Sequence, residues 1–227
     1  MPDIYTEEDW SEVTQATPAY QKGKTCAEKH AWAYVNAMPD EERIGFTTLL
    51  PGYLFGPTNI AKGYGSGNFM EGFFDGSLKK VGLPRLHIPV ADVRDCAIAH
   101  IRCLERDDAQ GKRYIILSST EWFREIGASL ECKYAPLGHT SIATQESKYC
   151  WVKLLSYTND KAAAMTKYWG ADLAFDNTSA KEILGVDFRP FQDSLYEMAD
   201  SLIENGHITH QINPPEIVAD PPVAPMV

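Results

Sequence analysis

The chain has 227 residues, 44% of them hydrophobic, and a formal net charge of −10 with a pI near 5.0. A chain of this length and composition can bury a sizeable hydrophobic core. Its negative field repels phosphate backbones, and no run of Lys or Arg is longer than a pair such as Lys79 and Lys80, so a nucleic-acid partner is not expected.

The sequence also gives no reason to expect a membrane partner or an oxidising compartment. Residues 1–10 are acidic and lack the apolar centre of a signal peptide, and no stretch approaches the ~20 apolar residues that span a bilayer. The five cysteines are odd in number and widely spaced, in a chain large enough not to need disulfides. We therefore predict a cytoplasmic protein with reduced thiols. Nothing in the sequence specifies an oligomeric state.

The first half of the chain indicates alternating helices and strands. Pro18 precedes an alanine-rich amphipathic stretch, which is typical of a helix start. Residues 43–50 are apolar and β-branched with little alternation, as expected of a strand buried on both faces, and Pro51-Gly52 ends them. Glycines at 63, 65 and 67 predict a loop. The elements expected are a helix over 20–37, a strand over 43–50, a helix ending near 78, a weaker strand over 85–90, a helix over 92–106 and a strand over 113–118.

The second half is less regular. Residues 120–175 mix short helical and loop patterns, and such a segment often carries substrate contacts. Two helices are expected next, at 179–184 and 191–204, and each is followed by a glycine that suits a helix C-terminus. The chain after Ile212 contains five prolines and little that could pack, which predicts a disordered tail.

The predicted fold class is α/β, the C-terminal part of a Rossmann-like doubly wound parallel sheet with a small, mostly helical substrate-binding region. We expect residues 1–119 to form the residual Rossmann-like part, 120–206 the helical substrate side and 207–227 the tail. Two or three strands cannot complete such a sheet, because a buried strand needs neighbours on both edges. The strands near 44–50 and 113–118 should therefore be parallel neighbours that leave one sheet edge bare.

Tyr20 and Lys24 form a Tyr-x-x-x-Lys pair, which places both side chains on one face of the predicted helix. An ammonium beside a phenol favours the phenolate, so such a tyrosine can give and take a proton at a carbonyl oxygen. The pattern alone is weak, since the pairs at 149/153 and 157/161 match it too. Only the first pair is followed by an Ala-rich helix and then a strand that ends in Pro-Gly, and we interpret the other two pairs as surface residues.

Four stretches of this chain resemble signatures of the extended short-chain dehydrogenases/reductases. The run from Ala19 to Lys29 is similar to their catalytic helix, and the run from Leu50 to Pro57 to their loop beside the nicotinamide. The runs Val90 to His100 and Asp176 to Gly185 are similar to two later signatures. The resemblance covers nearly all of residues 1–206 and is to the dihydroflavonol-reductase-like group.

The resemblance implies an NADP-dependent oxidoreductase, with NAD as a possible substitute, that acts on a small, largely apolar ketone or alcohol. It implies that Tyr20 is the proton donor and that Lys24 holds the nicotinamide ribose and assists the tyrosine. It further implies that a set of residues contacts the cofactor. These are Tyr20, Lys24, Pro51, Gly52, Tyr53, Leu54 and Ser66.

The chain departs from the family pattern in two ways. Gly23 stands before the lysine where the family usually has serine. The glycine-rich phosphate loop and the catalytic serine of the family precede the tyrosine, and only nineteen residues precede Tyr20 here. We therefore expect the 227-residue chain to bind NADP poorly and to be inactive on its own. Two alternatives stay open: a truncated, non-catalytic product or incomplete gene model, and a sugar-nucleotide epimerase or dehydratase.

Two further groups of residues invite a functional interpretation that we do not favour. Cys96, His100 and Cys103 share one helix face, but a single face has the wrong geometry for tetrahedral ligation, so no metal site is expected. The tryptophans are interpreted as core or pocket-wall residues. These are Trp122, Trp151 and Trp169.

Overall fold

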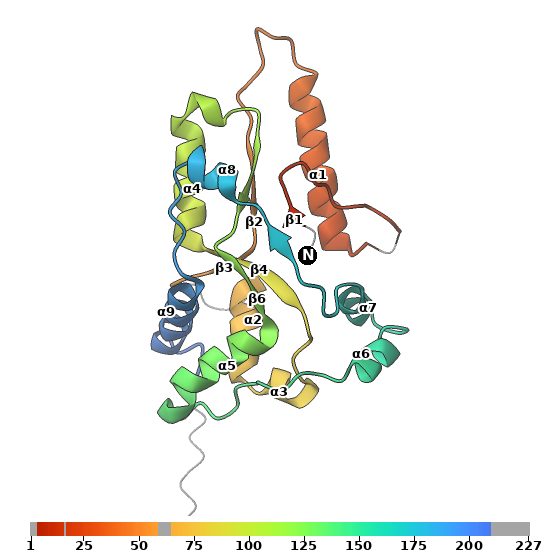
Figure 1. Cartoon of the computed structure of the whole chain (residues 1–227), viewed down its shortest axis with the longest axis vertical. Helices are drawn as coiled ribbons and strands as arrows, with labels where there is room; N and C mark the ends of the chain where they lie inside the picture. The colour runs from red at the N-terminus through yellow and green to blue at the C-terminus, as the bar shows by residue number, and fades with distance from the viewer. Residues whose placement is uncertain (1–3, 16, 59–64, 210–227) are drawn as a thin grey trace, which may run out of the picture.

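The computed structural model describes residues 4–15, 17–58 and 65–209. Short strands alternate with helices along this part of the chain (Figure 1). The strands are β1 Ile4–Tyr5, β2 Thr48–Pro51, β3 Tyr53–Phe55, β4 His87–Asp92, β5 Arg113–Ile116, β6 Ser119–Trp122 and β7 Ala174–Phe175. The helices are α1 Ala19–Asn36, α2 Gly65–Phe74, α3 Ser77–Val81, α4 Val93–Glu105, α5 Phe123–Tyr134, α6 Tyr149–Leu155, α7 Asp160–Lys167, α8 Thr178–Glu182 and α9 Phe191–Glu204. Two short 3₁₀ turns span Asp107–Ala109 and Ala135–Leu137.

The strands in this part of the chain pair in three small sheets. β2 pairs with β5 in parallel, with Thr48 opposite Arg113, which confirms the predicted neighbours. β3 pairs with β4 in parallel, and β1 pairs with β7 in parallel. β6 pairs with β4 in antiparallel orientation, which the sequence did not predict.

Strand β2 is more exposed than the sequence predicted. Its first three residues are half-buried and Pro51 is exposed, so the expectation of a strand buried on both faces is wrong. The physical reason lies in the pairing, since β5 is the only partner of β2 within the described residues. In the part of the chain that the structure describes, the other edge of β2 is thus unpaired, as the strand count predicted.

The Pro51-Gly52 pair does not end the extended segment but moves it to another sheet. The Gly52 amide donates to the carbonyl of Ile116 at 3.4 Å, and the chain then continues as β3 beside β4. A Cβ on Gly52 would lie 2.5 Å from the Pro89 carbonyl oxygen, so only glycine permits this close crossing. The crossing places β3, and with it Tyr53, directly after the end of β2.

Helices flank the β2–β5 pair in the arrangement expected of an α/β fold. In Figure 1, α4 and α8 lie on one side of the pair and α1 lies on the other. Helix α4 begins where Asp92 caps its first turn by accepting from the Arg94 amide. Helix α1 buries only Thr25 and Val35, and most of its surface is open.

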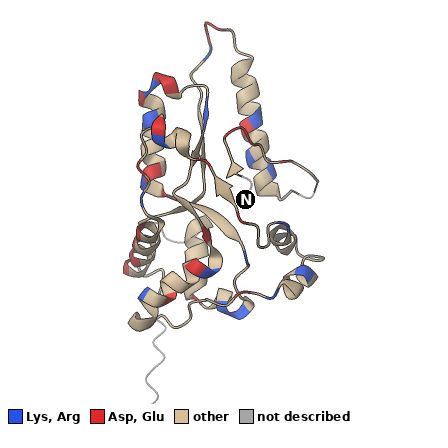
Figure 2. Ribbon diagram, viewed as in Figure 1, with Lys and Arg blue, Asp and Glu red and all other residues tan. Residues whose placement is uncertain are grey.

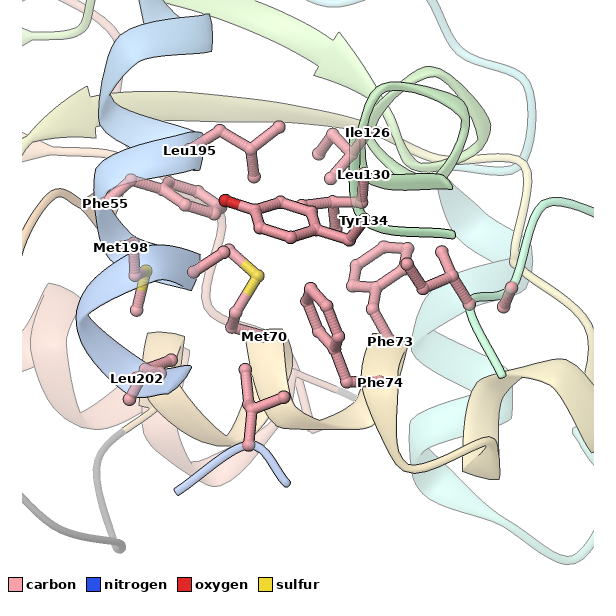
Figure 3. Close-up of a cluster of buried hydrophobic side chains, with 14 of the residues drawn as sticks. Phe55, Met70, Phe73, Phe74, Ile126, Leu130, Tyr134, Leu195, Met198 and Leu202 are labelled. Atoms are coloured by element: carbon pink, nitrogen blue, oxygen red, sulfur yellow. The ribbon is translucent and has the colours of Figure 1, made fainter. Parts of the chain in front are cut away.

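The core has two parts. The larger lies between β3, β4, α2, α5 and α9, and Figure 3 shows its aromatic and aliphatic side chains in contact. Tyr134 is fully buried there, and its hydroxyl donates to Asp200 Oδ1 at 2.7 Å. The smaller part joins α4 and α8 to β5 through residues such as Ala99, Tyr114 and Leu184.

Several other expectations can be compared with the structure. Gly65 and Gly67 belong to helix α2 rather than to a loop, because the residues that follow them bury Met70 and Phe73 at helical spacing. Gly63 and the proline-rich tail lie outside the described residues. Gly206 has a φ of 73° directly after the end of α9, as predicted for a helix C-terminus. Among the helices of the described ranges, none has the length and apolar character needed to cross a bilayer.

Candidate active site

Helix α1 presents Tyr20 and Lys24 on one face. The helix begins directly after Pro18, whose carbonyl accepts from the Lys22 amide at 2.9 Å. The four-residue spacing brings Lys24 Nζ to 5.7 Å from the centroid of the Tyr20 ring. The Tyr20 side chain is 75% exposed, so the ring and its hydroxyl are open to a ligand.

Tyr53 is the predicted cofactor residue that the structure brings to this pair. Burial raises the pKa of Tyr53, and the nearby Tyr20 phenol raises it further, because two phenolates would repel each other. The Tyr53 ring also packs against Phe69 of α2, with 5.9 Å between centroids. Tyr53 therefore packs against the aromatic wall of the larger core and lies within electrostatic range of Tyr20.

The other predicted cofactor residues are not joined to the pair by any contact within the described residues. Pro51 is exposed at the end of β2, and Leu54 packs against the smaller core. Gly52 faces Pro89 in the crossing described above. The common cleft expected for Tyr20, Lys24 and these residues therefore stays a prediction.

Ser66 is placed by helix α2. It is half-buried in the first turn of that helix, directly after the start of the described segment 65–209. Its proposed contact with the cofactor stays a prediction. Phe69, one turn further along α2, is the residue through which this helix reaches Tyr53.

Two cavities in the described part of the chain lie away from Tyr20. One, of about 330 Å³, lies between β6, α5 and the start of α9 and is lined by Glu121, Ile126 and Phe191 among others. The second, of about 480 Å³, is lined by Ser118, Lys181 and the turn after α8. Neither is lined by Tyr20 or Lys24.

An ion pair that the sequence patterns did not indicate attaches α1 to the sheet. Glu28 Oε1 accepts from Arg113 Nε at 2.8 Å and from Thr48 Oγ1 at 2.8 Å. Burial alone would raise the pKa of Glu28, but these hydrogen bonds outweigh burial and hold the pKa below its usual 4.5. The Arg113 guanidinium also stacks on Trp10 at 3.8 Å. Glu28 continues the four-residue spacing of Tyr20 and Lys24. That spacing is the sequence signal that could have indicated a role for Glu28 on the same helix face.

A second missed group centres on the buried carboxylate of Asp92. It accepts from Arg94 Nε at 2.9 Å and from Ser194 Oγ at 2.7 Å, and Arg94 also pairs with Glu197. Burial would raise the pKa of Asp92, but the hydrogen bonds from Arg94 and Ser194 lower it. This group connects β4 and α4 to α9. The sequence signal that could have indicated it is an aspartate directly before a helical run.

Cys96 and Cys103 belong to the packed face of α4. Both are buried in the smaller core, and burial raises the pKa of each thiol. Cys96 Sγ lies 3.9 Å from His100 Nδ1, which is also 2.7 Å from the Cys96 carbonyl oxygen. No group of three His, Cys, Asp or Glu residues in the described ranges is arranged to hold a metal ion. All five cysteines are free thiols.

Comparison with known proteins finds reductases that resemble this chain in sequence and in fold. No family model matches the chain. It is 24% identical over 217 residues to the Saccharomyces cerevisiae oxidoreductase YDR541C, covering 88% of this chain and 57% of the relative. It is 25% identical over 211 residues to the NADPH-dependent methylglyoxal reductase GRE2 of the same yeast, with coverage of 88% and 57%. The crystal structure of Gre2 from Candida albicans superposes with a TM-score of 0.69 at 22% identity, over 90% of this chain and 59% of that one.

These matches support the predicted fold class and the family resemblance. The fold is that of the Rossmann-like α/β reductases, as the sequence predicted. The relatives that the chain matches are oxidoreductases, which supports the resemblance to the extended short-chain dehydrogenases/reductases. It spans about 57% of the length of the curated relatives it matches.

Proposed function

We propose that this chain supplies the proton-transfer side of an NADP-dependent oxidoreductase acting on a carbonyl or secondary alcohol. The observation that carries the proposal is the Lys24 ammonium at 5.7 Å from the exposed Tyr20 ring, at the N-terminal end of α1. The relative GRE2, which is named an NADPH-dependent reductase, supports the assignment. We place the protein in the cytoplasm, in keeping with its free thiols.

The residues present suit the nicotinamide half of the cofactor. Lys24 carries N–H donors for ribose hydroxyls, and Tyr20 is exposed beside it. We assign Pro51 to Leu54 and Ser66 to the same half of the cofactor. The 227 residues contain no G-x-G-x-x-G turn, the usual cradle of the pyrophosphate, so we expect weak binding by this chain alone.

The proposed chemistry is a proton transfer coupled to a hydride transfer. Bound NADPH supplies the hydride to the carbonyl carbon. Tyr20 donates its phenolic proton to the carbonyl oxygen, and Lys24 stabilises the phenolate that remains. In the direction of alcohol oxidation, the Tyr20 phenolate takes the hydroxyl proton.

The surroundings of the pair favour an apolar substrate. Tyr53 is 45% exposed and continues into the aromatic contacts of Phe69. We propose that residues 1–119 carry the catalytic pair and that 120–206 form the substrate side, with a small ketone or alcohol between them. An aromatic wall binds such a molecule through dispersion and through removal of apolar surface from water.

The experiment compares the 227-residue chain with a chimera that adds the part of S. cerevisiae GRE2 that this chain does not match. We expect weak NADPH binding by the chain in a fluorescence titration and ketone-dependent NADPH oxidation by the chimera. In the chimera, Tyr20→Phe should lower turnover by roughly 10²–10⁴-fold, the usual contribution of a positioned proton donor. Tyr34→Phe is the matched control, because Tyr34 is 71% exposed on the same helix.

Full turnover by the Tyr20→Phe chimera would contradict the role of Tyr20. Micromolar NADPH binding with ketone reduction by the chain alone would show that it is active without the added part. A chimera that binds NADPH and converts a nucleotide sugar but no ketone would assign the protein to the epimerases or dehydratases. A chimera that binds no NADPH would favour a non-catalytic product.

A further inference from the structure

Helices α6 and α7 form a hairpin that exposes a group of large apolar side chains. Trp151 is 63% exposed, so the expectation that it is a core or pocket-wall residue is wrong. Leu154 is 60% exposed, Leu155 is 55% and Tyr157 is 77%. We call these four residues the hairpin stripe. Val152 is the buried residue of α6, and Trp151, Leu154 and Leu155 lie on the exposed part of this helix.

The spacing of Trp151, Leu154 and Leu155 makes these three residues one continuous surface. Trp151, Leu154 and Leu155 follow the i, i+3, i+4 pattern, which places them on one helix face. Tyr157 follows in the turn after α6, with Lys153 Nζ 5.8 Å from its ring centroid. Contiguous exposed apolar side chains of this kind mark an interaction site rather than a solvated helix face.

The hairpin is anchored at both of its ends to one segment of the body. Before α6, the Ser147 amide donates to the Leu83 carbonyl at 2.8 Å. After α7, the Gly170 amide donates to the Arg85 carbonyl at 2.7 Å. Figure 1 shows α6 and α7 side by side, away from the helices that surround the larger core. The stripe is therefore presented from a fixed base and is covered by no other element of the described chain.

The charge of the hairpin is opposite to that of the rest of the chain. Residues 147–170 contain four lysines and one aspartate, whereas the chain as a whole has 21 basic and 31 acidic residues. Lys148 and Lys153, which precede and follow Trp151 in the sequence, are both exposed. Lys167 Nζ lies 5.3 Å from the centroid of the Tyr168 ring. Figure 2 shows blue segments on both hairpin helices. The stripe is thus an apolar surface with a positive border.

We propose that the hairpin stripe binds the surface of a membrane that contains anionic lipids. Trp and Tyr are enriched where acyl chains meet headgroups, leucines enter the apolar side of that boundary, and lysines remain at the charged headgroups. The cytoplasmic leaflet carries a negative surface potential, which complements this border. The absence of a membrane-spanning helix from the described ranges does not oppose the proposal, because a helix that lies on a bilayer does not have to cross it.

A second copy of the chain suits the stripe less well. Two hairpins placed face to face would bring their lysines together, and like charges repel. The acidic remainder of the chain does not prevent contact with the membrane, because charges farther than about 8 Å from the lipid surface are largely screened at physiological salt. The local positive border therefore dominates at the stripe.

The test is cosedimentation of the 227-residue chain with vesicles of phosphatidylcholine alone or mixed with phosphatidylserine. We expect binding to the mixed vesicles that weakens as salt is raised. The double variant Leu154→Ser/Leu155→Ser should bind about tenfold or more weakly, because it loses apolar insertion. The variant Lys148→Gln/Lys153→Gln should lose about fivefold in affinity per lysine.

Matched control variants keep the test specific. Ile101→Ser/Leu104→Ser removes two exposed apolar side chains from α4, where they are 54% and 87% exposed, and Lys22→Gln/Lys181→Gln removes two exposed lysines elsewhere. Both controls should bind as the unaltered chain does. The proposal is overturned by no binding of the unaltered chain to the mixed vesicles, by equal losses in the controls, or by equal binding to both kinds of vesicle. A dimer in light scattering that the two leucine substitutions dissociate would assign the stripe to a second copy and overturn it too.

Discussion

Glu28 on α1 holds Arg113 at the start of β5, with 2.8 Å between the carboxylate oxygen and Arg113 Nε. Both side chains are largely buried, at 16% and 13% exposure. The same carboxylate accepts from Thr48 at the start of β2, so one side chain joins α1 to both strands. The position of Tyr20 and Lys24 relative to the sheet depends on this connection, because α1 buries little else.

Replacing Glu28 with glutamine should lower the free energy of unfolding by about 2 kcal/mol, the usual contribution of hydrogen bonds to a charged group that is mostly shielded from water. Urea unfolding at pH 7 measures the change. Glu105→Gln is the control, because its pair with Arg102 is exposed and should contribute no more than about 0.5 kcal/mol. Equal effects of the two substitutions would contradict the role given to Glu28.

The buried Asp92 should make the fold sensitive to acid. Its pKa is lowered from the usual 3.8, so the folded state binds a proton later than the unfolded state as the pH falls. The stabilisation is fully present above about pH 4 and is lost as the pH falls through the lowered pKa. Unfolding free energies measured from pH 7 down to pH 2 should fall steeply below pH 4, and Asp92→Asn should flatten this part of the curve. The exposed Asp108→Asn should leave most of the slope in place.

The two glycines near the site should respond to alanine in opposite directions. Gly52→Ala would place a Cβ 2.5 Å from the Pro89 carbonyl oxygen and 2.6 Å from Leu117, so the β2–β3 crossing must shift. We expect a loss of stability of about 1–3 kcal/mol. Gly23→Ala in α1 meets nothing within 4 Å and should raise stability by up to about 1 kcal/mol. Thermal unfolding of both variants tests the pair, and a neutral Gly52→Ala would refute the close crossing.

The bare edge of β2 should promote aggregation through added strands. The amides of Thr48 and Gly52 point toward β5, so by the alternation of a parallel ladder the Leu49 amide points to the bare edge and that of Leu50 toward β5. Leu49→Pro should therefore slow aggregation, whereas Leu50→Pro should mainly destabilise the fold. Light scattering during prolonged incubation measures the rate of aggregation, and unfolding curves measure the loss of stability. Faster aggregation of Leu49→Pro at unchanged stability would count against an edge mechanism.

Local patterns in the sequence determined much of this fold. The Tyr20 and Lys24 pair, the helices α1, α4 and α9, and the parallel neighbours β2 and β5 follow from spacing, caps and short apolar runs, because those signals act over a few residues. The resemblance to the reductase family also rests on such runs, from Ala19 to Lys29 onward. The segment 120–175 was not resolved this way: helix α5 was missed, and α6 and α7 are short, with most of α6 exposed.

The tertiary structure alone decided which distant side chains meet. The contacts of Glu28 with Arg113 and of Asp92 with Ser194 join positions 85 and 102 residues apart, and no periodicity connects such pairs. The antiparallel β6 and the sheet switch at Gly52 depend on the path of β4, which local propensity does not contain. Trp151 is apolar and would be placed in a core by composition, yet it is exposed. Burial is a property of what packs against a side chain, and only the folded chain determines that.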